Sequence, residues 1–228
     1  VLTYENYSYK VTENGIVITA YNGSEANPVI PSAIDETAVI SIGNSAFAEN
    51  TSITAVTIPS SITTIENKAF KNCTKLEKIT IPGNITTIGA EAFISCTNLT
   101  EIEIPSSVKQ INHHAFKNCT KLEKLTLNEG LTKLGYEAFT NTKITSVTIP
   151  STLTDVYINL VTNGGPFAGC ELLKDITIAE EATKIPNYLF KNCTQLEKIT
   201  IPGNMVTIGE EAFISCTNLT EIEIPSSV

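Results

Sequence analysis

The residues best suited to catalysis are few in this chain, beginning with its two adjacent histidines, His113 and His114. Neighbouring side chains diverge, and no further metal ligand lies within sequence reach, so the pair does not favour a metal site. A Ser-His-Asp triad is equally hard to assemble, because both histidines lie in one turn and the only aspartates, Asp35, Asp155 and Asp175, are scattered along the chain. We interpret the histidine pair as part of a solvated turn.

Two other patterns that could support chemistry lead no further. Glu101 and Glu103 form a carboxylate pair, but we expect them on an open sheet, where no pocket raises one pKa and both stay ionised. The glycine pair Gly164-Gly165 lacks the lysine and the following helix pattern of a phosphate-binding loop. The sequence therefore predicts that the protein is not an enzyme and uses no cofactor.

Six cysteines raise the question of disulfides or zinc. Each lies three residues after a phenylalanine: Cys73, Cys96, Cys119, Cys170, Cys193 and Cys216. Asn50 and Thr142 fill that place in two further units, so the cysteines form two stacked runs of three, which cannot pair without a leftover. The Cys-x-x-Cys spacing of many zinc sites is absent. We interpret the cysteines as buried free thiols that act as small apolar residues.

The elements that carry these residues repeat along the chain. All eight phenylalanines follow one another at 23 residues, with one step of 28: Phe47, Phe70, Phe93, Phe116, Phe139, Phe167, Phe190 and Phe213. A fixed period of this length is typical of a solenoid, because a single unit cannot bury its apolar face alone and must stack on its neighbours. We expect one phenylalanine ring per turn inside the coil.

One complete unit, 76–96, predicts how each turn is built. Ile79 and Ile81 alternate with Lys78 and Thr80, which is the pattern of a half-buried strand. A proline follows this strand in most units and marks its end, because proline lacks the N–H that a central strand needs. Successive units run in the same direction. We therefore expect a mainly β coil with a parallel sheet, one strand per turn of about 23 residues and little regular helix.

These residues also carry a family resemblance. Leu76-x-x-Ile79-x-Ile81-x-x-Asn84 matches the leucine-rich-repeat core, and the longer form with Ala92-Phe93-x-x-Cys96 resembles the BspA-like (treponemal-type) class. The likeness runs from roughly Val39 to the end and recurs in eight units. It implies a right-handed leucine-rich-repeat solenoid. It also implies a bacterial surface or secreted protein, since some members of that class are adhesins for host extracellular proteins.

The two ends of the chain differ from the repeats. In residues 1–38, two strand-like runs flank Glu13-Asn14-Gly15, which predicts a β-hairpin that caps the array of residues 39–228. The chain stops part-way through a unit. Moreover, Lys191–Val228 repeats Lys71–Val108 with substitutions at four positions only. We therefore expect that the array is truncated and belongs to a longer protein.

Composition limits the classes of partner. The formal charge is −9, and the 15 basic residues are all lysines. Nucleic-acid binding is disfavoured, because it needs basic patches and usually arginine. No apolar run approaches about 18 residues, so the sequence predicts no transmembrane segment. The expected function is a non-enzymatic adhesion or protein-interaction module at the cell surface, with a host or extracellular-matrix protein as partner. A structural spacer for another domain and carbohydrate recognition remain alternatives.

Candidate binding residues come from the outward positions of the strands and from the one lengthened unit. The strand candidates are Lys78, Glu101, Glu103, Lys124, Asp175 and Lys198. These charges also suit cross-strand pairing, so a structural role explains them equally well. The step of 28 residues lengthens the segment between Val156 and Phe167 and adds the apolar candidates Tyr157, Ile158 and Leu160. A tolerated surface loop is the alternative interpretation of that segment.

Overall fold

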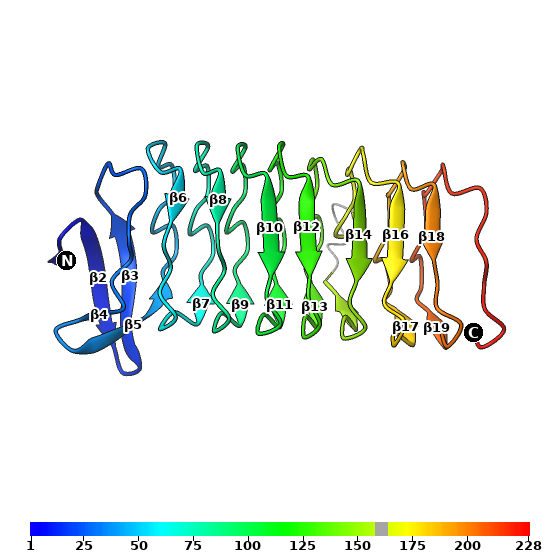
Figure 1. Ribbon diagram of the computed structural model, residues 1–228, viewed down its shortest axis with the longest axis horizontal. Coiled ribbons are helices and arrows are strands. Elements are labelled where there is room, and N and C mark those ends of the chain that lie inside the picture. Colours follow the sequence, from blue (N-terminus) through cyan, green and yellow to red (C-terminus); the bar gives the residue numbers. More distant parts are fainter. Residues whose placement is uncertain (158–163) are drawn as a thin grey trace.

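The computed structural model describes residues 1–157 and 164–228. The chain winds into an elongated coil with its two termini at opposite ends (Figure 1). All regular elements within those two ranges are short strands, and none is a helix. Accordingly, the described residues contain no helix that could cross a membrane.

The first sheet is built from one strand in each turn. It is a row of three separate ladders: β6 (Ala55–Val56) with β8 (Lys78–Ile79), β10 (Glu101–Ile104) with β12 (Lys124–Leu127), and β14 (Ser146–Ile149) with β16 (Asp175–Ile178) and β18 (Lys198–Thr200). Paired strands run parallel, as predicted. Ile102 and Ile104 face the core while Glu101 and Glu103 face solvent, which confirms the predicted alternation. Pro105 follows β10 directly and ends it.

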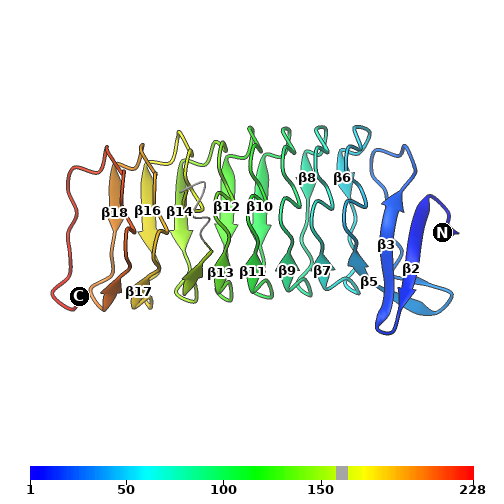
Figure 2. The ribbon, with the colours of Figure 1, turned by 180° about the vertical axis from the view of Figure 1, so that it is seen from behind.

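A second strand in each turn corrects the prediction of one strand per turn. Beyond the N-terminal end, these strands are β7 (Thr64–Ile65), β9 (Thr87–Ile88), β11 (Gln110–Ile111), β13 (Lys133–Leu134), β15 (Asp155–Val156), β17 (Lys184–Ile185) and β19 (Thr207–Ile208). They pair in parallel, β7 to β15 in one ladder that continues from the N-terminal strands and β17 with β19 in another, and we call this row the second sheet (Figure 2). Each contributes one inward and one outward side chain. Two residues are too few for the alternation to be read as a strand.

The rest of each turn of the coil is a series of tight backbone turns around the phenylalanine. Two residues four apart adopt left-handed backbone conformations, as at Lys68 (φ 59°) and Asn72 (φ 58°). This curls the chain back, so that the amide of Phe70 donates to the carbonyl of Ala92 in the following turn at 2.7 Å. Consecutive turns are thereby hydrogen-bonded on this side as well.

The core is a column of phenylalanine rings, as the period predicts. Within the array, neighbouring ring centroids lie 4.9 to 5.4 Å apart, except for 6.4 Å between Phe167 and Phe190. Seven of the rings are fully buried, while Phe213 in the last turn is only half-buried. Across the lengthened unit the Phe139 and Phe167 rings still stack, at 5.3 Å. The one wider step, from Phe167 to Phe190, follows one turn later.

The cysteines line this column as buried thiols, which confirms their predicted role as small core residues. The Sγ of Cys119 donates a hydrogen bond to the carbonyl oxygen of Phe93 in the preceding turn at 3.1 Å, and Cys96 bonds Phe70 in the same way at 3.2 Å. Burial raises the pKa of the Cys119 thiol to about 12. The thiols therefore stay protonated and serve as donors between turns.

At the N-terminal end the predicted hairpin is present. It comprises β2 (Tyr7–Thr12) and β3 (Gly15–Tyr21), flanked by β1 (Leu2–Tyr4), and is antiparallel. β3 then pairs in parallel with β5 (Thr37–Ile42), which also pairs with the short β4 (Ala33–Ile34). The Tyr21 ring stacks on Phe47 at 5.2 Å and so extends the aromatic column. The division into residues 1–38 and 39–228 stays a prediction, and β5 runs across it.

Candidate interaction surface

A shallow groove of about 460 Å³ lies on the outer face of the first sheet, across β8, β10 and β12. It brings together four predicted residues: Lys78, Glu101, Glu103 and Lys124. The remaining lining residues are Thr80, Thr126, Pro105 and the isoleucines Ile79, Ile81 and Ile102. We call this feature the β8–β12 groove. Its outer wall is polar and charged, and its floor is strand backbone.

The groove forms where the first sheet is interrupted. The ladder that pairs β6 with β8 and the ladder that pairs β10 with β12 belong to separate sheets. β8 ends at Ile79, whereas β10 continues for four residues to Ile104. Near the start of the two strands, the amide of Thr100 still reaches the carbonyl of Glu77 at 3.4 Å. No ladder joins the described strands β8 and β10, and the groove lies across this interruption of the sheet.

The charges of the groove are only loosely paired. Lys78 Nζ lies 3.8 Å from Glu101 Oε1, and the two side chains remain 70% and 49% exposed. Glu101 is opposite Lys124, and Glu103 is opposite Thr126. Exposed pairs of this kind contribute about 0–1 kcal/mol, so they can rearrange at small cost when a partner offers better contacts.

The other predicted residues lie apart from the groove. Asp175 and Lys198 are in register on β16 and β18 of the same sheet, beyond the groove. Tyr157 follows β15 on the second sheet and is 41% exposed, with the Lys133 ammonium 5.8 Å from its ring centre. Ile158 and Leu160 lie outside the described residues. Of the predicted binding residues, four therefore lie together in the groove, and Tyr157 lies elsewhere.

An aromatic cluster that sequence reasoning missed surrounds the two histidines. The His113 ring stacks on Tyr136 at 5.0 Å with a 2° interplanar angle, and His114 meets Tyr136 edge-on at 4.9 Å. The signal was present, because Tyr136 follows His113 by one period of 23 residues. The predicted solvated turn is therefore wrong for His114, whose Nε2 is buried and has no hydrogen-bond partner.

Charged neighbours set the electrostatics of this cluster. His114 Nε2 lies 3.4 Å from the carboxylate of Glu137, without hydrogen-bond geometry, and Lys117 Nζ binds that same carboxylate at 2.5 Å. Burial, with the Lys117 charge added, lowers the pKa of His114, and the opposing attraction of Glu137 is too weak to restore it. His114 is consequently held in its neutral form.

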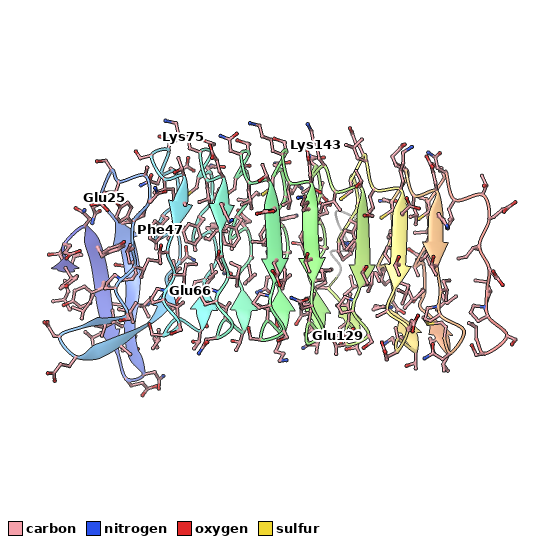
Figure 3. All side chains as sticks on the ribbon, viewed as in Figure 1. Glu25, Phe47, Glu66, Lys75, Glu129 and Lys143 are labelled. Atoms are coloured by element: carbon pink, nitrogen blue, oxygen red, sulfur yellow. The ribbon has the colours of Figure 1, made fainter. Side chains whose placement is uncertain are left out.

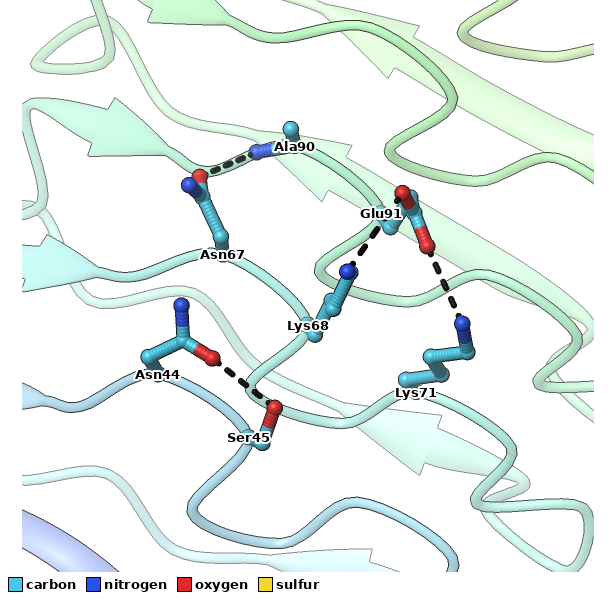
Figure 4. A network of polar contacts seen from close by, with 7 residues as sticks. All are labelled: Asn44, Ser45, Asn67, Lys68, Lys71, Ala90 and Glu91. Atoms are coloured by element: carbon cyan, nitrogen blue, oxygen red, sulfur yellow. Dashed lines mark hydrogen bonds and ion pairs between the residues drawn. The ribbon is translucent and has the colours of Figure 1, made fainter.

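The same region of other turns forms a network of polar contacts (Figure 4). The Asn67 amide oxygen accepts from the Ala90 N–H at 2.8 Å, and Lys71 donates to Glu91 at 3.1 Å, with Lys68 3.9 Å away. Burial alone would raise the pKa of Glu91, but the lysines outweigh it and the pKa is lowered. Each contact joins one turn to the next, so we assign the network a structural role.

Charged side chains also project from the two margins of the coil, whereas Phe47 lies inside (Figure 3). Lys75 and Lys143 are at one margin and Glu129 is at the opposite one. The Glu129 carboxylate accepts hydrogen bonds from the N–H and the hydroxyl of Ser151, both at 2.8 Å. These bonds satisfy the carboxylate within the fold. Across the two described ranges, no group of three or more His, Cys, Asp or Glu side chains is arranged to hold a metal ion.

Comparison with known proteins identifies a repeat family. A family model described as "BspA type Leucine rich repeat region" matches residues 40–164 and 163–228, in six copies. No functionally curated protein matches the sequence.

Several solved structures share the architecture. The T. pallidum leucine-rich repeat protein TpLRR has a TM-score of 0.63 and 24% identity, covering 96% of this chain and 91% of that one. A leucine-rich cell surface protein from Faecalibacterium prausnitzii A2-165 gives 0.53 and 22%, covering 97% and 94%. The pneumococcal vaccine antigen PcpA gives 0.59 and 20%, covering 90% and 70%. At these identities the likeness concerns the fold alone.

Proposed function

Because the chain belongs to the BspA-type leucine-rich repeat family, we propose that it is a non-enzymatic interaction module that binds a protein partner through the β8–β12 groove. Solenoids of this kind typically bind along an extended surface that many turns share. The observation that supports this site is the convergence of Lys78, Glu101, Glu103 and Lys124 on one groove. The buried core behind the groove keeps these side chains on a rigid scaffold.

We place this activity at the cell surface, with a host or extracellular-matrix protein as the partner. One support is that a structural neighbour is described as a cell surface protein, and another is that a further neighbour is described as a vaccine antigen. The acidic character of the chain, with a formal charge of −9, favours partners with basic segments. Because the groove lacks aromatic and arginine anchors, each contact is weak, and many copies would supply avidity.

A binding panel with a blocked groove tests this proposal. Purified protein is measured against immobilised fibronectin, laminin, collagen and fibrinogen, and a glycan array on the same sample tests carbohydrate recognition. The variant Thr80→Trp fills the groove from the position just after β8, whereas Thr148→Trp places the same ring on β14, outside the groove. We expect binding to at least one matrix protein, weakened about tenfold or more by Thr80→Trp and unchanged by Thr148→Trp.

Three results would contradict the proposal. Equal binding by the two tryptophan variants would show that the partner binds outside the groove. Binding to no protein of the panel, together with binding to glycans, would favour carbohydrate recognition. The absence of binding to either class would favour the structural spacer.

A further inference from the structure

Half of the β8–β12 groove occurs twice on this molecule. Lys71–Val108 and Lys191–Val228 differ only at Lys75/Gln195, Ile85/Met205, Thr86/Val206 and Ala90/Glu210. None of these four differences falls on the outward positions of the first sheet. The set Lys78, Thr80, Glu101 and Glu103 therefore recurs as Lys198, Thr200, Glu221 and Glu223. We call these the first and second acidic steps.

The two copies share three kinds of contact, although β10 (Glu101–Ile104) has no strand counterpart at the described residues 221–224. Cysteine-to-carbonyl bonds, threonine-to-carbonyl bonds and lysine–glutamate pairs recur at matching positions with similar lengths. The pairs are Cys96–Phe70 (3.2 Å) and Cys216–Phe190 (3.1 Å), Thr97–Thr74 (3.3 Å) and Thr217–Thr194 (3.3 Å), and Lys71–Glu91 (3.1 Å) and Lys191–Glu211 (2.6 Å). Glu221 and Glu223 are exposed, as Glu101 and Glu103 are. Both acidic steps therefore present the same side chains to solvent, the second from a segment whose Ile222 and Ile224 are themselves 39% and 48% exposed.

Their spacing follows from the coil. Lys78 and Lys198 are separated by five turns along the first sheet, through Glu101, Lys124, Ser146 and Asp175. Parallel strands lie about 4.8 Å apart, so the two acidic steps are about 24 Å apart along the axis. Stacked phenylalanine rings join the turns between the two steps.

The charges indicate which chemistry fits each step. Glu103 is flanked in its own row by Thr80 and Thr126, and the Asn128 amide donates to its carboxylate at 3.0 Å. No cation therefore neutralises it within its row of the described sheet, whereas Glu101 has Lys78 nearby. A carboxylate in this position is suited to an arginine or lysine side chain on an extended segment, and arginine can bind it through two parallel hydrogen bonds.

We propose that the outer face formed by the first sheet and by residues 221–223 is bivalent. Its first and second acidic steps are two docking points of the same composition for a protein that presents two basic, extended segments about 24 Å apart. This inference rests on the proposed function and names the partner chemistry of the same surface. Two linked contacts of this kind can exceed the affinity of either one by roughly 10²- to 10⁴-fold without any new contact.

Matched peptide probes test the bivalency. The single probe is the peptide Ser-Arg-Thr-Arg-Ser, and the double probe joins two copies of it through a Gly/Ser linker of about 19 residues. Such a linker has an average end-to-end distance of about 24 Å. Dissociation constants are measured by calorimetry for the wild-type chain and for Glu103→Gln, Glu223→Gln and the control Glu77→Gln. Glu77 has the same charge but lies just before β8, outside the outward rows.

We expect the double probe to bind the wild-type chain and the control at least tenfold more tightly than the single probe. Glu103→Gln or Glu223→Gln alone should abolish this advantage. Equal affinities of the two probes, indifference to Glu223→Gln or no binding of either probe would each overturn the inference. If Thr80→Trp still abolishes binding to a matrix protein while both glutamine variants leave it intact, the groove remains the binding site and only the bivalent, basic partner is rejected.

Discussion

The His114 ring meets Tyr136 edge-on and lies beside the carboxylate of Glu137, which also binds the ammonium of Lys117. Its pKa is lowered, first by burial and then by Lys117. The folded state therefore binds a proton at this site less readily than the unfolded chain, whose histidine has a pKa of about 6.5. Stability from this site is complete above that pH and is lost as the pH falls below it.

We predict that the free energy of unfolding decreases as the pH falls from 7.5 to 5.5, and that His114→Gln reduces this decrease. Glutamine keeps a polar side chain of similar size but cannot take up the proton. Urea denaturation at pH 5.5, 6.5 and 7.5 measures both chains. A variant with the same pH dependence as the wild type would show that His114 does not cause it. The lowered pKa values of Glu91 and Glu129 act in a separate window, below the ordinary glutamate value.

The thiols allow a second prediction at the residue scale. Burial raises the pKa of Cys73 and of Cys170 to about 12, whereas that of the less enclosed Cys216 rises to about 11. Since the thiolate is the reactive form, we expect Ellman's reagent at pH 8 to label no more than Cys216 in the folded protein and all six cysteines in denaturant. Rapid labelling of Cys73 or Cys170 in the folded protein would contradict this burial.

At the scale of the elements, glycines show how closely adjacent turns approach. A Cβ added to Gly135 would meet the backbone N of His113 at 2.2 Å and the carbonyl carbon of Asn112 at 2.4 Å. A Cβ added to Gly83, in the loop after β8, would meet nothing within 4 Å. The strand-to-turn junction at Gly135 thus excludes a side chain, whereas the margin of the coil tolerates one.

We predict that Gly135→Ala lowers the free energy of unfolding by about 1–3 kcal/mol, because the neighbouring backbone must move to admit the methyl group. Gly83→Ala serves as the matched control and should stay within about 0.5 kcal/mol of the wild type. Urea denaturation followed by circular dichroism compares the three chains. Equal stability of the two variants would mean that the turns can separate at little cost.

Much of this architecture could be predicted from the sequence, because the buried residues recur at fixed spacing. Ile102 and Ile104 identify a strand of the first sheet, and the phenylalanine period identifies the column. The two-residue strands such as Thr87–Ile88 could not be predicted, because so short a segment shows no alternation. The outward charges were also predictable. Their convergence on a groove was not, because it depends on the interruption of the ladder between β8 and β10.

At the scale of the whole molecule, the two copies of the repeated block, 71–108 and 191–228, can be compared directly because they differ at only four positions. Phe93 and Leu99 are fully buried in the earlier copy, between neighbouring turns on both sides. The matching Phe213 and Leu219 are only partly buried in the last turns. In a stacked array, each unit draws its stability from its neighbours, so identical sequence at the two places should open at different rates.

We predict that backbone amides of 206–228 exchange with deuterium markedly faster than those of 86–108. Intrinsic exchange rates of the two blocks are nearly equal because their sequences nearly coincide, so the ratio reports on neighbouring turns alone. Mass spectrometry of matching peptides measures it. Equal protection of the two blocks would show that the coil opens as one unit rather than from its end.

The direction of the hydrogen bonds has a mechanical consequence. The bonds from Phe70 N to Ala92 O and from Phe93 N to Ala115 O, both 2.7 Å long, join successive turns and therefore run along the long axis of the coil. Tension between the two ends would pull these bonds apart in line with the force, and turns would detach one after another. Each detached turn of 23 residues would release about 80 Å of chain. Under load the protein would lengthen stepwise, as an extensible tether, and shorten again as turns rewind.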